Sequence, residues 1–154
     1  MDDTDRALIG ALRRDARASW AALGRVVGLS GPSVTERVSR LEKAGVITGY
    51  HATVDPAALG RSVAALVGIQ LSDTSDQDAV AVALSRLEEI EDCWFVAGDE
   101  SFLIKVRVLD VTGLEATLSR LRRISGIAHT RTTVVLSTKW EGRNAQAPDR
   151  LSPQ

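Results

Sequence analysis

The stretch that decides the fold is residues 30–45, "SGPSVTERVSRLEKAG". It begins as a helix begins: Ser30 is a good N-cap, and Pro32 falls in the first turn, where its missing N–H costs nothing. Gly45 then ends the predicted helix. Apolar residues at helical spacing predict a buried stripe that packs on two preceding helices: Val34, Val38 and Leu41.

The opposite side of this helix is predicted to be polar and basic. Arg donates two hydrogen bonds to guanine, Arg and Lys both neutralise phosphate, and hydroxyls reach bases or phosphates. Glu36 could accept from a cytosine amino group or pair with Arg40. Any amphipathic helix has a charged face. This helix alone is therefore compatible both with an ordinary surface helix and with a helix that contacts DNA bases. The candidate DNA contacts are Ser30, Ser33, Thr35, Glu36, Arg37, Arg40 and Lys43.

The segments around this helix favour DNA binding. One helix is predicted from Asp3 or Thr4 to about Asp15, and a second follows the cap residue Ser19 and ends at Gly28. Their predicted apolar faces are Leu8, Ile9 and Leu12, then Trp20, Leu23, Val26 and Val27. After the third helix, "VITGYHATVD" (46–55) is typical of a short strand or wing. Three helices with a short turn and a wing predict a winged helix-turn-helix.

The second half alternates strand and helix patterns. Strands are predicted in "SVAALVGIQLS" (62–72), "DCWFVAG" (92–98), "SFLIKVRVLD" (101–110) and "AHTRTTVVLSTKW" (128–140), with "GDES" as a hairpin turn. Helices are predicted over 77–90 and up to Gly126. The order βαββαβ is ferredoxin-like, so the fold class is α+β. One sheet face is expected to lack helices and to pack on a partner, because it keeps apolar and small residues.

These patterns predict the domain limits. We expect a DNA-binding domain over 1–50, a linker over 51–61, and a ferredoxin-like domain for effector binding and oligomerisation over 62–140. The polar stretch 141–154 is expected to be a disordered tail.

Composition narrows the class of protein. The 154 residues carry a net charge of −1, so any nucleic-acid site has to be a local patch. Cys93, the single cysteine, excludes an intrachain disulfide and is expected to be a buried structural thiol. The acidic N-terminus lacks a secretory pattern, and no apolar stretch could span a bilayer. We therefore expect a cytoplasmic protein that has no contact with a membrane.

No catalytic or metal-binding motif stands out. G-x-S-x-G, H-E-x-x-H and a phosphate-binding glycine loop are absent from the sequence, and "DTSDQD" (73–78) does not fit a calcium loop. We expect no enzymatic activity, no catalytic residue, no cofactor and no metal.

The motifs resemble those of the Lrp/AsnC, or feast/famine, family. The similar residues are the turn at 29–30, "RVSRLE" (37–42), "GVITGY" (45–50) and "VDPAALG" (54–60), followed by "VAGDESFLIKV" and "GIAHTRTTVVLSTK". The resemblance covers roughly residues 3 to 140. It implies a transcriptional regulator that binds double-stranded DNA and senses a small molecule, usually an amino acid. It also implies homodimers, joined through the open sheet faces, that assemble into tetramers or octamers.

The predicted effector hairpin departs from the family pattern. Family members commonly have an Asp where this chain has Ser101, and here the acids are Asp99 and Glu100. If one of these acids supplies the missing charge, the effector is an amino acid; otherwise a ligand without an ammonium group is expected. Plain turn chemistry would also explain "GDES". The effector residues implied by the resemblance are Gly98, Asp99, Glu100, Ser101, Thr130 and Thr132.

Two other functions remain open at this stage. Sirohaem decarboxylases share the architecture, and His129 and Arg131 on the last strand are the side chains that such an enzyme would use. A Soret shift on adding haem would favour it. A metabolite-binding module without DNA regulation is the third possibility, and the basic face of Arg37, Arg40 and Lys43 argues against it.

Overall fold

The computed structural model describes residues 1–142. The chain forms two units, built on Met1–Thr53 and Val54–Thr138. The predicted tail of 141–154 lies, apart from its first two residues, outside the described range.

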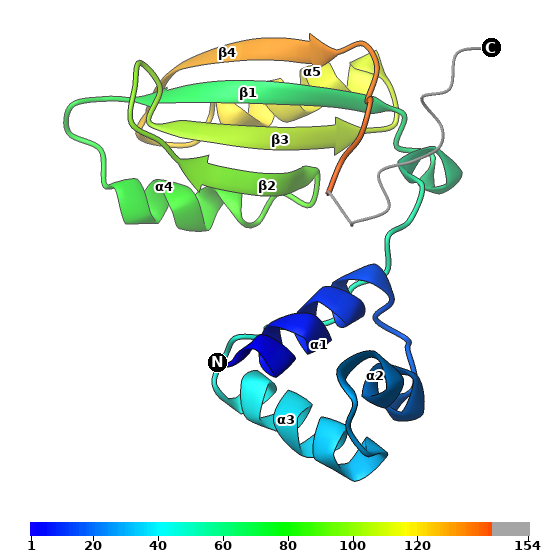
Figure 1. The fold of residues 1–154 in the computed structure, drawn as a ribbon. Helices are drawn as coiled ribbons and strands as arrows, with labels where there is room; N and C mark the ends of the chain where they lie inside the picture. The colour runs from blue at the N-terminus through cyan, green and yellow to red at the C-terminus, as the bar shows by residue number, and fades with distance from the viewer. Residues whose placement is uncertain (143–154) are drawn as a thin grey trace. The chain divides into compact units, whose positions relative to one another are not determined.

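The first unit consists of three helices, α1 (Asp3–Arg14), α2 (Trp20–Val27) and α3 (Gly31–Lys43) (Figure 1). Each places an apolar stripe in one common core, as the periodicity predicts. The buried members of this core are Leu8, Ala11, Leu12, Leu23, Val34 and Val38.

Side-chain caps fix where these helices begin. Ser19 and Ser30 cap α2 and α3 as expected, by accepting from the amides of Ala22 and Ser33. Helix α1 begins at Asp3 as predicted, but its cap is Asp2 rather than Asp3 or Thr4, and Asp2 forms a reciprocal capping box with Asp5. The predicted face of α2 is also partly wrong. Trp20 and Val26 are exposed, because an eight-residue helix with neighbours on one side buries only a narrow stripe.

Two glycines make the turn between α2 and α3 possible. Gly28 adopts a left-handed conformation with φ 70°, as expected for a helix C-cap. Gly24, on the inner face of α2, has a less visible role: a Cβ there would lie 2.4 Å from the carbonyl oxygen of Leu29. The backbone after the turn therefore approaches α2 closely.

The segment that follows α3 forms no strand. Residues 48–55 have no regular secondary structure, so the expected strand or wing between 46 and 55 is not built as a β-structure. Instead, Tyr50 donates its hydroxyl to the Glu42 carboxylate at 2.8 Å. Side-chain contact with α3 thus replaces strand pairing here.

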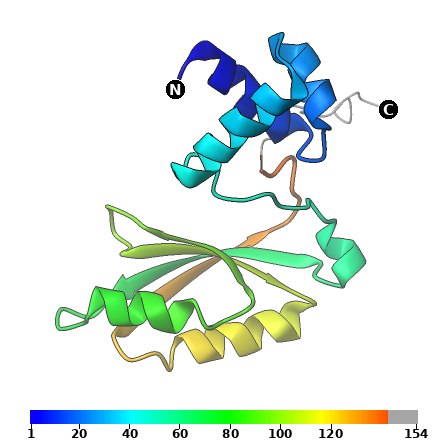
Figure 2. The same cartoon turned by 90° about the horizontal axis from the view of Figure 1, so that it is seen from below.

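The second unit has the predicted ferredoxin-like topology. After a short 3-10 turn, η1 (Pro56–Leu59), come β1 (Val63–Leu71), α4 (Gln77–Leu84), β2 (Ile90–Phe95), β3 (Phe102–Val108), α5 (Val111–Leu121) and β4 (Ile127–Val135). The strands form one antiparallel sheet in the order β2-β3-β1-β4. Both helices lie on one face of this sheet (Figure 2), and neither covers the opposite face.

The alternation of side chains in the central strands builds the core under α4 and α5. The buried apolar residues of β3 are the predicted ones, Phe102, Ile104, Val106 and Val108, and β1 adds Ala65, Val67 and Ile69. Leu84, Leu114 and Leu121 complete the core from the helices. The alternate residues of β1 and β3 therefore face the side without helices.

Four local predictions in this unit are wrong. Helix α4 ends at Leu84 rather than near Ile90, and α5 ends at Leu121 rather than near Gly126. Strand β4 ends at Val135 rather than continuing to residue 140. Cys93 is exposed rather than buried. It lies on β2, an edge strand paired only with β3, so its apolar neighbours are not covered on both sides.

Candidate DNA-binding surface and effector pocket

The exposed side of α3 carries most of the predicted DNA contacts. Thr35, Glu36, Arg40 and Lys43 are exposed, whereas Val34, Val38 and Leu41 on the other side are buried. At the start of the helix, the hydroxyls of Ser30 and Ser33 hydrogen-bond to each other at 2.9 Å. The Thr35 hydroxyl donates to the carbonyl of Gly31 at 3.1 Å. These side chains are thus at least partly accessible and lie on a single helix.

Arg37 differs from the other predicted contacts because it binds two carboxylates at the start of α1. Its Nη1 donates to the Asp2 carboxylate at 2.7 Å and to the Asp5 carboxylate at 2.8 Å. The Asp5 side chain is only 4% exposed, and Arg40 also reaches it, at 3.4 Å. Within the described residues, Arg40 therefore pairs with Asp5 and not with Glu36 as one expectation had it. The N-terminus of α1 and the basic side of α3 form one charged cluster.

The titration behaviour of this cluster follows from its hydrogen bonds. The amide of Asp5 lowers the pKa of Asp2, and the amide of Asp2 lowers that of Asp5; the Arg37 guanidinium lowers both further. The same two carboxylates raise the pKa of Arg37. Both acids are consequently ionised at neutral pH and hold Arg37 in place. Nearby, burial and the Glu42 carboxylate raise the pKa of Tyr50 to about 12.

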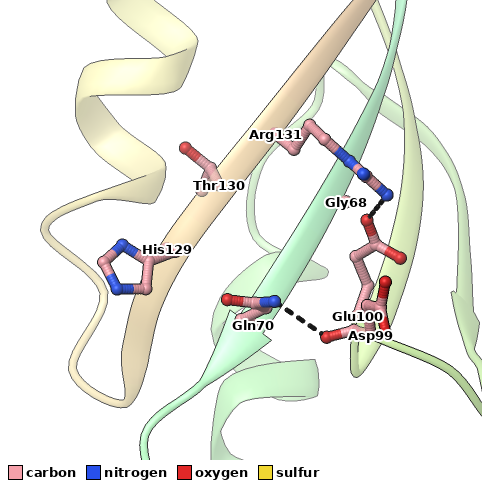
Figure 3. Close-up of a pocket in the computed structure, with 7 residues that line it drawn as sticks. All are labelled: Gly68, Gln70, Asp99, Glu100, His129, Thr130 and Arg131. Atoms are coloured by element: carbon pink, nitrogen blue, oxygen red, sulfur yellow. Dashed lines mark hydrogen bonds and ion pairs between the residues drawn. The ribbon is translucent and has the colours of Figure 1, made fainter.

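The predicted effector hairpin borders an open pocket of about 410 Å³ at one end of the sheet. Three elements supply its lining (Figure 3): β1, the β2–β3 hairpin and β4. The lining residues are Gly68, Gln70, Asp99, Glu100, His129, Thr130 and Arg131.

An ion pair crosses this pocket. The Glu100 carboxylate accepts from the Arg131 guanidinium, and Figure 3 shows the two side chains meeting beside Gly68. A Cβ at Gly68 would lie 2.6 Å from Cγ of Glu100, so the acidic side chain occupies the space that any other residue at 68 would fill. The Gln70 amide also donates to the carbonyl of Asp99 at 3.0 Å.

The pocket brings together only some of the predicted effector residues. Asp99, Glu100 and Thr130 line it, whereas Gly98, Ser101 and Thr132 do not. Gly98 has φ 155°, a conformation that favours glycine. Ser101 ties the hairpin to β1: its amide donates to the carbonyl of Ile69 at 2.8 Å, and its hydroxyl accepts from the amide of Leu71 at 3.4 Å. Thr132 pairs with the core residue Val67 in β1.

Several residues at these two sites were not among the predicted ones. Asp2 and Asp5 could have been suspected only from the D-x-x-D spacing of a capping box, which gives no sign of a distant arginine. Gly68 and Gln70 carried no signal beyond their place in a strand. The sequence singles out Arg131 and His129 only for the enzyme alternative. In Figure 3, His129 is directed away from Glu100.

No helix in residues 1–142 combines the length and the apolar character needed to cross a membrane. In the same range, no group of three or more His, Cys, Asp and Glu side chains is arranged to hold a metal ion.

A helix-turn-helix unit with an exposed basic helix, followed by a ferredoxin-like unit with an open polar pocket, defines a DNA-binding regulator with a ligand-binding domain. Comparison with known families specifies it further. Residues 1–42 match the AsnC-type helix-turn-helix domain, and residues 64–145 match the Lrp/AsnC ligand binding domain. The chain belongs to the Lrp/AsnC family of transcriptional regulators, and it is a DNA-binding regulator that responds to a small metabolite.

Similar proteins agree with this assignment. The HTH-type transcriptional regulator LrpA of Mycobacterium tuberculosis is 40% identical over 143 residues, which cover 93% of this chain and 95% of that protein. The leucine-responsive regulatory protein of Escherichia coli is 39% identical, over 88% of this chain and 85% of its own. A feast or famine regulatory protein from M. tuberculosis, solved in complex with L-methionine, has a TM-score of 0.87 and 40% identity, covering 92% and 96% of the two chains. Because these relatives are named as regulators, they favour a transcriptional regulator over a decarboxylase-like enzyme and over a metabolite-binding module without DNA regulation.

Proposed function

We propose that the chain binds double-stranded DNA through the exposed side of α3 and that an amino acid bound at the hairpin pocket controls this binding. The observation that carries the first half is the division of α3: its apolar side is buried, while Arg40 and Lys43 remain accessible. Exposed cations on a helix that follows a short turn are suited to the major groove.

The residues of α3 divide into two roles under this proposal. Ser33, Glu36 and Arg40 read base edges, whereas Ser30, Thr35 and Lys43 contact phosphates. Arg37 contributes charge near the DNA but mainly holds α3 against α1, because Asp2 and Asp5 occupy its Nη1. We assign DNA binding to residues 1–50, a linker role to 51–61, and effector binding to 62–140.

The second half of the proposal concerns the effector and the assembly. The complex of the M. tuberculosis relative with L-methionine supports an amino acid as effector. Within the ferredoxin-like unit, the helix-free sheet face bears Ala64, which is already buried, and the more exposed Leu66 and Leu103, which a second copy of this face would bury. We propose homodimers formed in this way that assemble into tetramers or octamers. Light scattering at micromolar concentration should report an even-numbered species, and a monomer would contradict it.

We also propose that the protein acts in the cytoplasm and without catalysis. Relatives named as transcriptional regulators support both statements. The two carboxylates at the pocket, Asp99 and Glu100, would repel the carboxylates of a tetrapyrrole, and this opposes a decarboxylase-like activity. Added haem should therefore leave the Soret band where free haem has it.

Genome-wide mapping of bound sites, with and without L-methionine, tests the regulatory function. Mapped fragments then serve for fluorescence-anisotropy titrations with wild type and Arg40→Ala. Arg122→Ala provides the control, since it removes the same charge from the other unit. The proposal expects weaker specific binding for Arg40→Ala alone. Equal affinities of all three proteins for the mapped fragments would show that α3 does not contact DNA through Arg40.

A further inference from the structure

The Asp5 carboxylate connects the N-terminus of α1 to the basic side of α3. Its Oδ1 accepts from Nη1 of Arg37 at 2.8 Å and from Nη2 of Arg40 at 3.4 Å. Its Oδ2 accepts from the amide of Asp2 at 3.1 Å. Because only 4% of the Asp5 side chain is exposed and both of its oxygens have donors, the carboxylate is held in place.

The two arginines that share Asp5 differ in their accessibility. The Arg37 side chain is 27% exposed, and the carboxylates of Asp2 and Asp5 both accept from it. The Arg40 side chain is 61% exposed, and Asp5 is the one hydrogen-bond partner of its guanidinium within residues 1–142. A guanidinium carries five N–H donors in a planar fork. With one N–H of Nη2 directed at Asp5, the other N–H of Nη2 and both of Nη1 remain available to a further partner.

We propose that Asp5 is a positioning residue for DNA recognition: it holds Nη2 of Arg40 and thereby orients the guanidinium toward a guanine edge in the major groove. The inference rests on the proposed DNA-binding function and names the residue on which its sequence preference depends. Guanine presents two coplanar acceptors, O6 and N7, which match the Nη1 and Nη2 donors of one fork. An arginine that is already oriented loses less side-chain entropy when both hydrogen bonds form.

Asp5 has two other effects on DNA binding, and neither depends on base sequence. Its negative charge repels the phosphates of any duplex. Its contact with Arg37 also holds α1 against α3, so a loss of folded protein would weaken binding to all duplexes by the same factor. Both effects cancel in the ratio of the affinity for a matched site to the affinity for an unmatched one. A change in this ratio therefore reports the orientation of Arg40, and not stability or charge.

Fluorescence-anisotropy titrations of the full chain against one mapped site and one scrambled duplex test the proposal. Asp5→Asn removes the charge and keeps the size of the side chain. Arg40→Lys keeps the charge and removes the planar fork, and Arg40→Ala removes both. Asp3→Asn is the matched control, because Asp3 lies in the same turn of α1, is 96% exposed and pairs with Arg6 rather than with α3.

The variants should separate orientation from charge. Asp5→Asn should lower the ratio roughly two- to tenfold, since ordering a flexible side chain costs about 0.5–1.5 kcal/mol. The same change in the Arg40→Ala background should leave the ratio where Arg40→Ala alone puts it, because Asp5 acts through Arg40. Arg40→Lys should also lower the ratio, because an ammonium group has no fork to orient. Asp3→Asn should keep the wild-type ratio.

The inference is overturned if Asp5→Asn keeps the wild-type ratio, or if it lowers the ratio equally in the presence and in the absence of Arg40. If Asp5→Asn leaves the helical unit unfolded, Arg40→Lys decides: a wild-type ratio for this variant would show that binding uses no oriented fork.

The proposed function fails in a different way. Wild-type affinity of Arg40→Ala for the mapped site would contradict DNA recognition through Arg40. Loss of sequence preference in Arg40→Ala but not in Asp5→Asn would contradict the positioning role alone.

Discussion

The two units use the same chemical pair, an arginine with carboxylates, in different surroundings. In the helical unit, Arg37 is 27% exposed and its partner Asp5 is 4% exposed. In the ferredoxin-like unit, Arg131 is 73% exposed and Glu100 is 20% exposed. Breaking a covered pair leaves a charge that water cannot reach, whereas an exposed pair exchanges its partner readily for water or a ligand. We infer that the first pair holds two helices together and that the second is available for recognition.

Asp5→Ala should have the largest effect, because it removes the covered carboxylate that accepts from both Arg37 and Arg40. We expect the helical unit to melt several degrees lower, or to lose its cooperative transition, in differential scanning calorimetry. Asp3→Ala is the matched control, since Asp3 is 96% exposed and pairs only with Arg6 one turn away. Equal melting of the two variants would show that burial of the pair does not matter.

Lowering the pH should destabilise the helical unit, because it protonates the carboxylates of Asp2 and Asp5. The pKa values of Asp2 and Asp5 are lowered in the folded chain. Their contribution to stability is thus complete above the ordinary Asp value and is lost as the pH falls through the lowered values. Thermal melting between pH 7 and about pH 2 should show this loss, the ordinary Asp pKa being about 3.9. Asp5→Asn should flatten the profile over the acidic end; a profile as steep as that of the wild type would assign the acid sensitivity to other groups.

Gly68→Ala should break the exposed pair without unfolding the ferredoxin-like unit. The new Cβ would meet Glu100, a flexible side chain that can move aside. Urea unfolding should therefore show a loss of no more than about 1 kcal/mol, as for other exposed pairs. Calorimetric titration should show weaker amino-acid binding. Gly10→Ala is the comparison: its nearest atom would be 3.8 Å away, within a helix, and it should stabilise by roughly 0.5–1 kcal/mol.

A double-mutant cycle on Glu100 and Arg131 should give the smallest effect. Exposed pairs have coupling energies of about 0.2–1 kcal/mol. Urea unfolding of Glu100→Ala, Arg131→Ala and the double variant measures this value. The same cycle on Asp5 and Arg37 should give a larger coupling. If the order were reversed, exposure would not be what separates the two pairs.

The elements of the fold could be predicted because their signals are local. Cap residues and apolar periodicity placed α2, α3 and β3 close to their observed limits. The errors concern residues whose burial depends on elements that are distant in the sequence. Cys93 is exposed because β2 is an edge strand, and Val26 is exposed because neither α1 nor α3 covers that side of α2. Strand order and helix neighbours are not visible in a short window of sequence.

The site residues could likewise be predicted only where the signal is local. A helical wheel suffices to put Arg40 and Lys43 on the accessible side of α3, because the period of one helix determines both sides. It could not show that Arg37 reaches Asp5, 32 residues earlier. Likewise, the hairpin "GDES" signals a turn, but only the register of β1 with β4 places Arg131 beside Gly68 and within reach of Glu100.

Recognition of DNA by α3 is tested most directly by anisotropy titration of one mapped site and one scrambled duplex over a range of salt concentrations. Arg40→Ala should lose roughly 1–3 kcal/mol of specific binding and little binding to the scrambled duplex, if Arg40 reads a base. An equal loss on both duplexes, with a reduced salt slope, would reassign Arg40 to a phosphate. Affinity for the mapped site equal to that of the wild type would contradict DNA recognition by this face of α3.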